Sequence, residues 1–443
     1  MNTFVLRGNI CFSKDVNTLY TAERGYVVCE NGICQGVFEE LPEKYQNMPC
    51  HDYGDRLILP GLVDLHMHAP QYAFRALALD LELLEWLDKY AFKVESQYAD
   101  IEYARKAYEI FVDDLVKGAT TRICLFGTLH TEATLLLMEM LEQSGMRAYV
   151  GKVNMDRNSP EYLCEESADK AAADTRQWIE ESIKRFRNIK PIITPRFTPS
   201  CSDELMAQLG RLQREYKLPV QSHLSENYGE IAWVQELCPN TRFYAEAYDQ
   251  FGMFGTNGPS VMAHCVHSSE EEMELMKKQG VFVAHCPQSN ANLSSGIAPA
   301  REYLERGIHI GLGCDIGGGT TLNLFRCMCE AIQYSKLRWR LIDQTKAPLK
   351  LEEVFHMATK GGGAFFGKVG SFETGYEFDA LVIDDSSLRY PRKLDIRERV
   401  DRLLYMAEDN QITAKYVAGK KLFDKTGNYS KQVEALAAET VRM

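Results

Sequence analysis

The chain has 443 residues, of which 45% are hydrophobic and 25% charged, and this ordinary globular composition favours neither a disordered nor a fibrous class. Its formal net charge of −12 argues against a nucleic-acid backbone or an anionic membrane surface as partner, because both repel a uniformly acidic protein. A small neutral or cationic substrate suits this charge better.

The sequence also bears on the compartment in which the protein works. The N-terminal residues lack the apolar block of a secretion signal, and no run of about 18 apolar residues occurs, so we expect no spanning helix. The thirteen cysteines are odd in number and scattered, and Cys124, Cys265 and Cys314 lie in or beside apolar runs. Buried thiols in a reducing cytoplasm are the simplest interpretation.

The first segment of the chain has the pattern of short strands separated by turns. Residues 4–6 and 25–29 are mostly apolar and include valines, and Asn31-Gly32 is a strong hairpin signal. We expect a β-rich unit here without a crossover helix.

From residue 57 onward, short apolar runs alternate with stretches of helical periodicity. Helices are predicted at residues 81–90, 103–117 and 202–216. The predicted strands are 57–63, 122–126, 148–153, 191–197, 219–223, 261–264, 281–285 and 308–314. Eight strands that are apolar on both faces, most of them separated by a helix, predict an α/β fold with a (β/α)₈ TIM-like barrel over residues 60–370.

After about residue 370 the sequence returns to strand character, at residues 380–383 and 414–418. Because both ends of the chain are β-rich and flank the barrel, we predict that residues 1–59 and 371–443 pair into one small flanking β-sandwich.

Five polar side chains lie at the ends of the predicted barrel strands: His66, His68, His223, His264 and Asp315. Residues i and i+2 of a strand face the same side, and strand ends meet at one rim of a barrel. Each histidine alone is more often a hydrogen-bonded structural residue, but five coinciding positions favour a mononuclear metal site with nitrogen and oxygen ligands.

These residues resemble those of the amidohydrolase superfamily, because Pro-Gly-Leu-Val-Asp at 60–64 precedes His66 and the other ligands follow at successive strand ends. The resemblance implies one divalent ion, because Arg196 stands where members with two metals carry a lysine. Zinc is expected, and Fe²⁺ is not separated from it by ligand type. The metal ligands so implied are His66, His68, His223 and Asp315, whereas His264 would contact the reactive hydroxide at least as much as the ion.

Two carboxylates are candidates for proton transfer. In deaminases of this superfamily a glutamate follows the strand-five histidine by three residues, as Glu226 follows His223 here, and it shuttles protons. A plain acid at a helix N-terminus is the alternative for Glu226. Asp315 would be the general base, with His264 as the third catalytic residue, although a turn residue before Gly317 is the alternative for Asp315.

Several longer segments resemble the guanine deaminase family within the superfamily, namely 66–72, 80–87, 194–201, 221–227 and 261–264. The resemblance implies that Gln71, Arg196 and Phe197 bind the purine, Arg196 by donating to the O6 side. His68, His223, Glu226 and Asp315 would face the substrate as well. A structural role is the alternative for two of these residues, since Arg196 could pair with a carboxylate and Gln71 could cap a helix.

The expected activity is therefore hydrolytic deamination of guanine to xanthine and ammonia, by a homodimer. Residues 73–79 depart from the family pattern, Arg75 above all, which leaves another aminopurine, a nucleoside or a triazine as alternative substrates. A non-catalytic structural relative is the rival from another class, although such relatives typically lose metal ligands. The helix around Trp86 is a candidate lid over the site.

Overall fold

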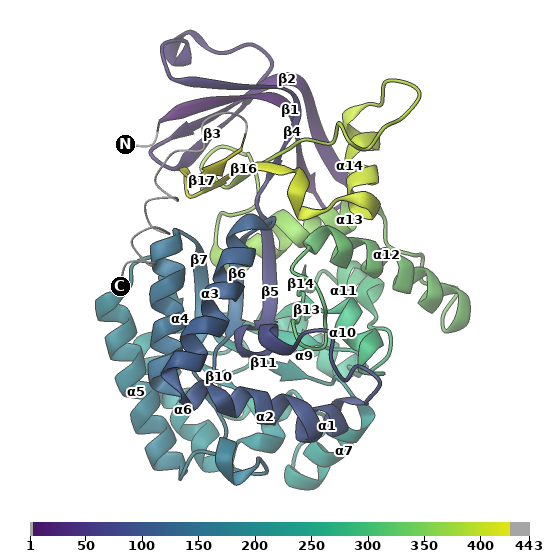
Figure 1. Ribbon diagram of the computed structural model, residues 1–443. Helices are drawn as coiled ribbons and strands as arrows, with labels where there is room; N and C mark the ends of the chain where they lie inside the picture. Colours follow the sequence, from purple (N-terminus) through teal and green to yellow (C-terminus); the bar gives the residue numbers. More distant parts are fainter. Residues whose placement is uncertain (1–2, 426–443) are drawn as a thin grey trace.

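The described chain is built around two sheets (Figure 1). Gly61 is the single residue between a strand of the smaller sheet and the first strand of the larger one. The structure is a computed structural model that describes residues 3–425. The smaller sheet combines the two ends of the chain, as predicted, and lies above the barrel in Figure 1. Its seven strands run in the order β17-β16-β15-β4-β1-β2-β3. They are β1 (Phe4–Asp15), β2 (Thr18–Glu30), β3 (Ile33–Phe38), β4 (Cys50–Pro60), β15 (Ala380–Ile383), β16 (Ile412–Val417) and β17 (Lys420–Asp424).

Successive side chains of a strand point to opposite faces, and this terminal sheet buries apolar side chains on both of its faces. Phe4 and Leu6 pack in one buried cluster, whereas Val5 packs in another with Tyr45. The predicted hairpin is confirmed, because Asn31 and Gly32 both adopt positive φ between β2 and β3. The boundaries at residues 59 and 371 stay a prediction, and residues 426–443 of the second segment lie outside the described residues.

The larger sheet is the predicted parallel barrel of eight strands, in the order β11-β12-β13-β14-β5-β6-β7-β9. A bridge between Ile193 and Val220 joins the segment after β9 to β11 and closes the ring. The barrel strands are β5 (Leu62–His68), β6 (Thr120–Phe126), β7 (Arg147–Gly151), β9 (Ile189–Pro191), β11 (Val220–Leu224), β12 (Ser260–His264), β13 (Phe282–His285) and β14 (His309–Leu312). Beside them, β8 (Val153–Asn154) pairs with β10 (Thr194–Pro195).

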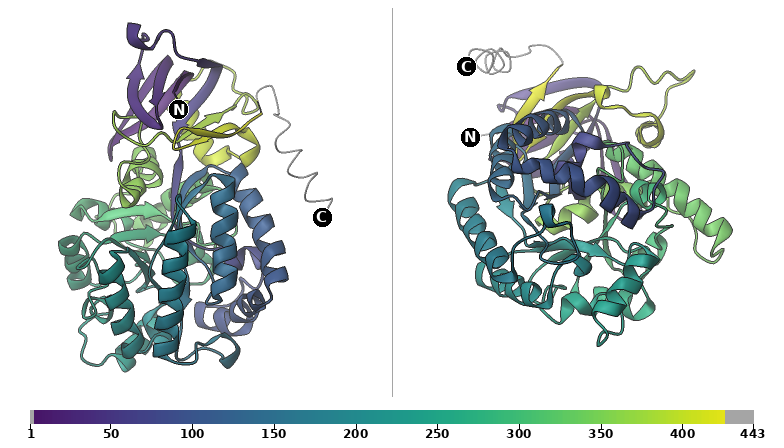
Figure 2. Two further views of the ribbon diagram at one scale, coloured as in Figure 1. Left: turned by 90° about the vertical axis from the view of Figure 1, so that its left-hand side faces the viewer. Right: turned by 60° about the horizontal axis from the view of Figure 1, so that its bottom comes forward.

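Helices surround the barrel, as the view from below shows (Figure 2). The predicted helix at 202–216 is α6, where the Ser202 side chain accepts the Leu205 N–H and caps the first turn. The helices are α1 (Leu83–Trp86), α2 (Phe92–Glu95), α3 (Ile101–Lys117), α4 (Thr131–Ser144), α5 (Ala168–Arg185), α6 (Asp203–Tyr216), α7 (Tyr228–Leu237), α8 (Glu246–Asp249), α9 (Glu270–Gln279), α10 (Pro287–Asn292), α11 (Ala300–Arg306), α12 (Leu324–Leu341), α13 (Leu351–His356) and α14 (Ile396–Met406). No helix within residues 3–425 combines the length and apolarity needed to cross a membrane.

Three predicted elements differ from the structure. The apolar run 57–63 is not the first barrel strand, because residues up to Pro60 belong to β4 and β5 begins only at Leu62. A Cβ at Gly61 would lie 2.1 Å from Thr121 Oγ1, so the chain passes between the sheets where only glycine fits. The run 191–197 is divided between β9 and β10, and the helix at 81–90 is interrupted by a π-helical turn, Leu87–Ala91.

A buried ion pair holds the terminal sheet against the barrel. Arg122 on β6 donates to both carboxylate oxygens of Asp379 at 2.5 and 2.8 Å, and to Glu377 at 2.9 Å. The side chains of Arg122 and Asp379 are 3% and 0% exposed. Asp379 also accepts the Ala418 N–H at 2.7 Å, so it joins three segments of the chain.

Replacement of this arginine tests that connection. We expect Arg122→Met to lower the free energy of unfolding by about 3–5 kcal/mol, because it leaves the Asp379 carboxylate buried without its cation. The matched control is Arg185→Met, which removes a surface pair with Glu139 and should lower it by less than about 1 kcal/mol. Denaturant titration measures both, and equal small losses would contradict the role given to Arg122.

Candidate active site

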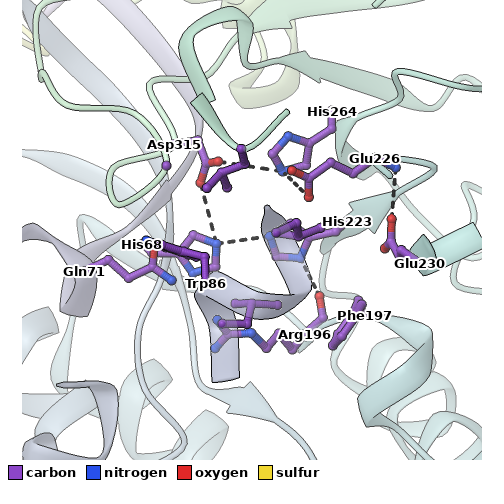
Figure 3. Close-up of a pocket in the computed structure, with 14 residues that line it drawn as sticks. His68, Gln71, Trp86, Arg196, Phe197, His223, Glu226, Glu230, His264 and Asp315 are labelled. Atoms are coloured by element: carbon purple, nitrogen blue, oxygen red, sulfur yellow. Dashed lines mark hydrogen bonds and ion pairs between the residues drawn. The ribbon is translucent and has the colours of Figure 1, made fainter. Parts of the chain in front are cut away.

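Four of the five predicted strand-end residues line one pocket (Figure 3), namely His68, His223, His264 and Asp315. His66 does not line this pocket but lies beside Asp315 in the same cluster. The space between atoms in this pocket is about 410 Å³, part of it open to solvent. It is lined by His68, Gln71, Leu83, Trp86, Leu87, Arg196, Phe197, His223, Glu226, Glu230, His264, Leu293, Asp315 and Gly318. Trp86 therefore forms part of the wall, together with other residues of the α1 region.

The imidazoles and the carboxylate lie close enough to share one ion. His68 Nε2 is 3.0 Å from His223 Nε2 and 3.7 Å from Asp315 Oδ1, and His66 Nε2 is 3.1 Å from the same oxygen. Ligand atoms of His66, His68 and Asp315 lie within 4.8 Å of one another, and so do those of His66, His223 and His264. His66 Nε2 is buried, and Asp315 Oδ1 is its partner in the cluster, so both atoms could bind the same metal ion.

Partners outside the cluster set the tautomers of two of the imidazoles. His223 Nδ1 lies 2.6 Å from the Arg196 carbonyl, which can only accept, so Nδ1 carries the proton and the Nε2 lone pair faces the pocket. His264 Nδ1 lies 2.9 Å from Asn290 Oδ1 in the same way. The His223 ring therefore offers an unprotonated Nε2. Burial opposes the charge on His264, but the carboxylates of Glu226 and Asp315 near its Nε2 outweigh burial and raise the pKa of this ring.

Burial favours the protonation states that a cation requires. Desolvation lowers the pKa of His68 and of His223 well below the usual value, so these rings are neutral. Burial opposes the charge on Asp315, but His66, His264 and His68 outweigh it and hold the pKa of this carboxyl well below its usual range. Neutral imidazoles beside an ionised carboxylate are a donor set that fits a divalent metal ion.

An unusual backbone conformation orients two of these side chains. His264 and Asp315 have φ of 72° and 44°, a left-handed conformation unusual for residues other than glycine. The surroundings hold Asp315 in place, because its N–H donates to the His66 carbonyl at 2.9 Å. Asp64 joins the same two strands by accepting N–H groups of His66 and Cys314. Such strain persists where the structure enforces it, as at functional sites.

Glu226 points into the pocket and not along a helix. Asn227 caps α7 and Glu230 completes the capping box, so the helix-terminal role considered for Glu226 belongs to Glu230. Glu226 Oε2 lies 3.4 Å from His264 Nε2, and Oε1 accepts from Ser295 Oγ at 3.0 Å. Burial raises the pKa of Glu226 to about 7, which suits a group that both gives and takes a proton near neutral pH.

The predicted substrate residues Gln71, Arg196 and Phe197 line the pocket, but two of them already have a partner. Arg196 forms a bidentate pair with Glu95, the structural alternative considered from the sequence, and Gln71 donates to the same carboxylate. Arg75, which departs from the family pattern, stacks on Tyr72 with its guanidinium 3.8 Å from the ring centroid, and it is not among the residues that line the pocket.

Sequence reasoning missed several residues around the site. Asn290 and Ser295 follow β13 and have no pattern that distinguishes them from ordinary loop residues. Glu230 was detectable, because Asn227 followed by glutamate three residues later is a capping-box pattern. Glu95 looks like any helix-surface acid in the sequence, although it is only 3% exposed. His285 is buried in the barrel, and its Nδ1 has no hydrogen-bond partner among the described residues.

Comparison with known proteins places this fold and site in a family. A model of the amidohydrolase family matches residues 57–422, and the chain belongs to that family. Within it, the chain is 37% identical to a guanine deaminase from Dictyostelium discoideum, over 94% of this chain and 98% of that protein. It is 39% identical to a guanine deaminase from Mus musculus, over 87% of each chain.

A solved structure agrees with these sequence relatives. A crystal structure of guanine deaminase from C. acetobutylicum with guanine bound in the active site matches this chain with a TM-score of 0.92 and 47% identity. The match covers 95% of this chain and 100% of that chain. The α/β barrel with a sheet from both termini, predicted from the sequence, is thus confirmed by the structure and by its relatives.

The geometry of the cluster predicts the metal content of the protein. The purified protein should carry about one divalent ion per chain by elemental analysis, and His68→Asn should lose most of it, because it removes one of the few imidazole nitrogens that would hold the ion. His285→Asn is the matched control, since His285 is buried nearby but outside the cluster, and it should retain the ion. Equal retention by both variants would contradict the site.

Proposed function

We propose that this chain is a guanine deaminase, which converts guanine and water to xanthine and ammonia. The observation that carries the proposal is the joint presence in one buried pocket of a histidine–aspartate cluster and a guanidinium, that of Arg196. The names of the relatives, and the guanine bound in one of them, support the same activity.

The ion we propose is a single Zn²⁺, held by His66, His68, His223 and Asp315, with His264 beside it. When bound, such an ion supplies Lewis-acid activation of a water molecule, whose pKa it lowers from about 16 towards 7. The neutral rings and the ionised carboxylate described above support this choice, although the same ligand types also suit iron.

The two carboxylates divide the proton transfers between them. Asp315 is ionised and takes a proton from the water as its oxygen adds to C2 of guanine, while Glu226, in its protonated form, gives a proton to N3. The proton on Asp315 then passes to the amino group, the C2–N bond breaks and ammonia leaves. Glu226 takes back the proton of the new C2 hydroxyl, which becomes the carbonyl of xanthine.

Recognition of the base falls to the opposite side of the pocket. The Arg196 guanidinium has only hydrogen-bond donors and would donate to the O6 acceptor of guanine. The C6 amino group of adenine is itself a donor and would form no hydrogen bond with the Arg196 donors. Phe197 contributes an apolar wall, and the leucines and Trp86 of the α1 region exclude water from the ring.

The activity is tested with guanine before and after chelation. We expect the metal-loaded protein to deplete the ultraviolet absorbance of guanine, a chelator to abolish this, and added Zn²⁺ to restore it. Glu226→Gln should keep its metal but lower kcat by about 10²–10⁴-fold, because the amide cannot transfer the proton. Consumption of adenine or a triazine with guanine untouched would refute the assignment.

We further propose a cytoplasmic homodimer. Buried thiols such as those of Cys124 and Cys314 support a reducing compartment. Leu337, Leu341 and Ile342 are exposed at the outer end of α12, which projects from the barrel in Figure 1 and supplies apolar surface for a second copy. Light scattering should report twice the chain mass, and a monomer at micromolar concentration would refute the dimer.

A further inference from the structure

One buried carboxylate, that of Glu95, holds both residues on the recognition side of the pocket. Glu95 Oε1 accepts from Gln71 Nε2 at 2.7 Å and from one terminal nitrogen of Arg196 at 3.0 Å, and Oε2 accepts from the other at 2.5 Å. The Glu95 and Arg196 side chains are 4% and 3% exposed. Glu95 does not itself line the pocket, so it acts through its two partners.

Glu95 decides the orientation of the Gln71 amide. An ionised carboxylate can only accept hydrogen bonds, so the Gln71 NH₂ group must face it and the amide oxygen must turn away. That oxygen lies against Gly317, where a Cβ would come within 1.9 Å of it. Gly317 therefore leaves room for the oxygen, and the acceptor of Gln71 is fixed on the side away from Glu95.

Glu95 also fixes the plane and the charge of Arg196. The bidentate pair uses two of the five guanidinium N–H donors and leaves three for other partners. The ring of Phe92 lies under the same guanidinium, with its centroid 5.0 Å from the Arg196 Cζ. The orientation of the remaining donors is therefore fixed, and the cation is paired although it is buried.

We propose that Glu95 is a positioning residue that selects 6-oxopurines by setting the donor and acceptor pattern of Gln71 and Arg196. Guanine presents an acceptor at O6 beside a donor at N1–H, which matches a fixed donor at Arg196 and a fixed acceptor at Gln71. A purine without the 6-oxo group has neither feature. The inference rests on the proposed function and adds to it the origin of base selectivity.

A purely structural role is the competing explanation. Glu95 ends α2, and the segment before it carries the pocket residues Leu83, Trp86 and Leu87, so the pair with Arg196 also ties this segment to the barrel. Loss of that tie would weaken the binding of every purine, whereas loss of positioning would weaken only those that carry the 6-oxo edge.

The experiment compares two ligands in one variant, Glu95→Gln, with its metal content measured. Guanine is the substrate, and 2-aminopurine, which shares the 2-amino group but lacks O6 and the N1 hydrogen, competes against it. The KM for guanine should rise about tenfold or more, with a smaller fall in kcat, because an amide can face Gln71 either way and no longer neutralises Arg196. The Ki of 2-aminopurine should change less than about threefold.

Two further variants complete the test. Glu102→Gln, an exposed residue at the start of α3, is the control and should leave both constants unchanged. If Glu95→Gln does not fold, Glu95→Asp keeps the charge but shortens the reach to its two partners, and it should raise the guanine KM with little change in the 2-aminopurine Ki. Parallel losses for both ligands in either variant would overturn the proposal, whereas a wild-type protein inactive on guanine would refute the function itself.

Discussion

The site depends on keeping several imidazoles neutral, buried and turned with their lone pairs toward one point. Removal from water makes the charged form of His68 and His223 unfavourable, and the Arg196 carbonyl fixes which nitrogen of His223 carries the proton. A carboxylate at the same point, that of Asp315, then supplies the negative charge. The barrel brings these imidazoles and the carboxylate together because they lie at the ends of its parallel strands, and those ends meet at a single rim.

The barrel secures this arrangement with further polar residues that hydrogen-bond the members of the cluster and their backbone. Asp64 joins the backbone of β5 to the residue before Asp315, and Asn290 orients His264 from the far side. The left-handed backbone of His264 and Asp315 is tolerated because hydrogen bonds and close packing enforce it. Glu226 depends on the same kind of support, since the Ser295 hydroxyl donates to it, the Glu230 carboxylate accepts its backbone N–H, and it lies beside His264.

The side of the pocket around Arg196 is built differently, since Arg196 is held by a segment outside the barrel strands. The π-helical turn at Leu87–Ala91 lies in this segment, and such turns occur often at functional sites. Glu95 follows it, and its carboxylate connects the segment to Arg196, which is 101 residues distant in the chain. Residues of the histidine–aspartate cluster line the pocket, and so does Arg196 (Figure 3). Strand ends position the cluster, and the buried ion pair with Glu95 positions Arg196.

The sequence alone determined the barrel and the residues at its rim, because strands buried on both faces appear as continuous apolar runs and each candidate ligand ended one of them. It also indicated the pairing of the two chain ends, through local strand and hairpin signals. Only the tertiary structure decided that β4 and β5 part at Gly61, that Arg75 turns onto Tyr72, and that Glu95 holds Gln71 and Arg196. The periodicity of apolar residues indicates which faces of a helix or strand are buried. The features that only the tertiary structure decided arise from contacts between segments distant in the chain, and such contacts produce no periodic pattern in the sequence.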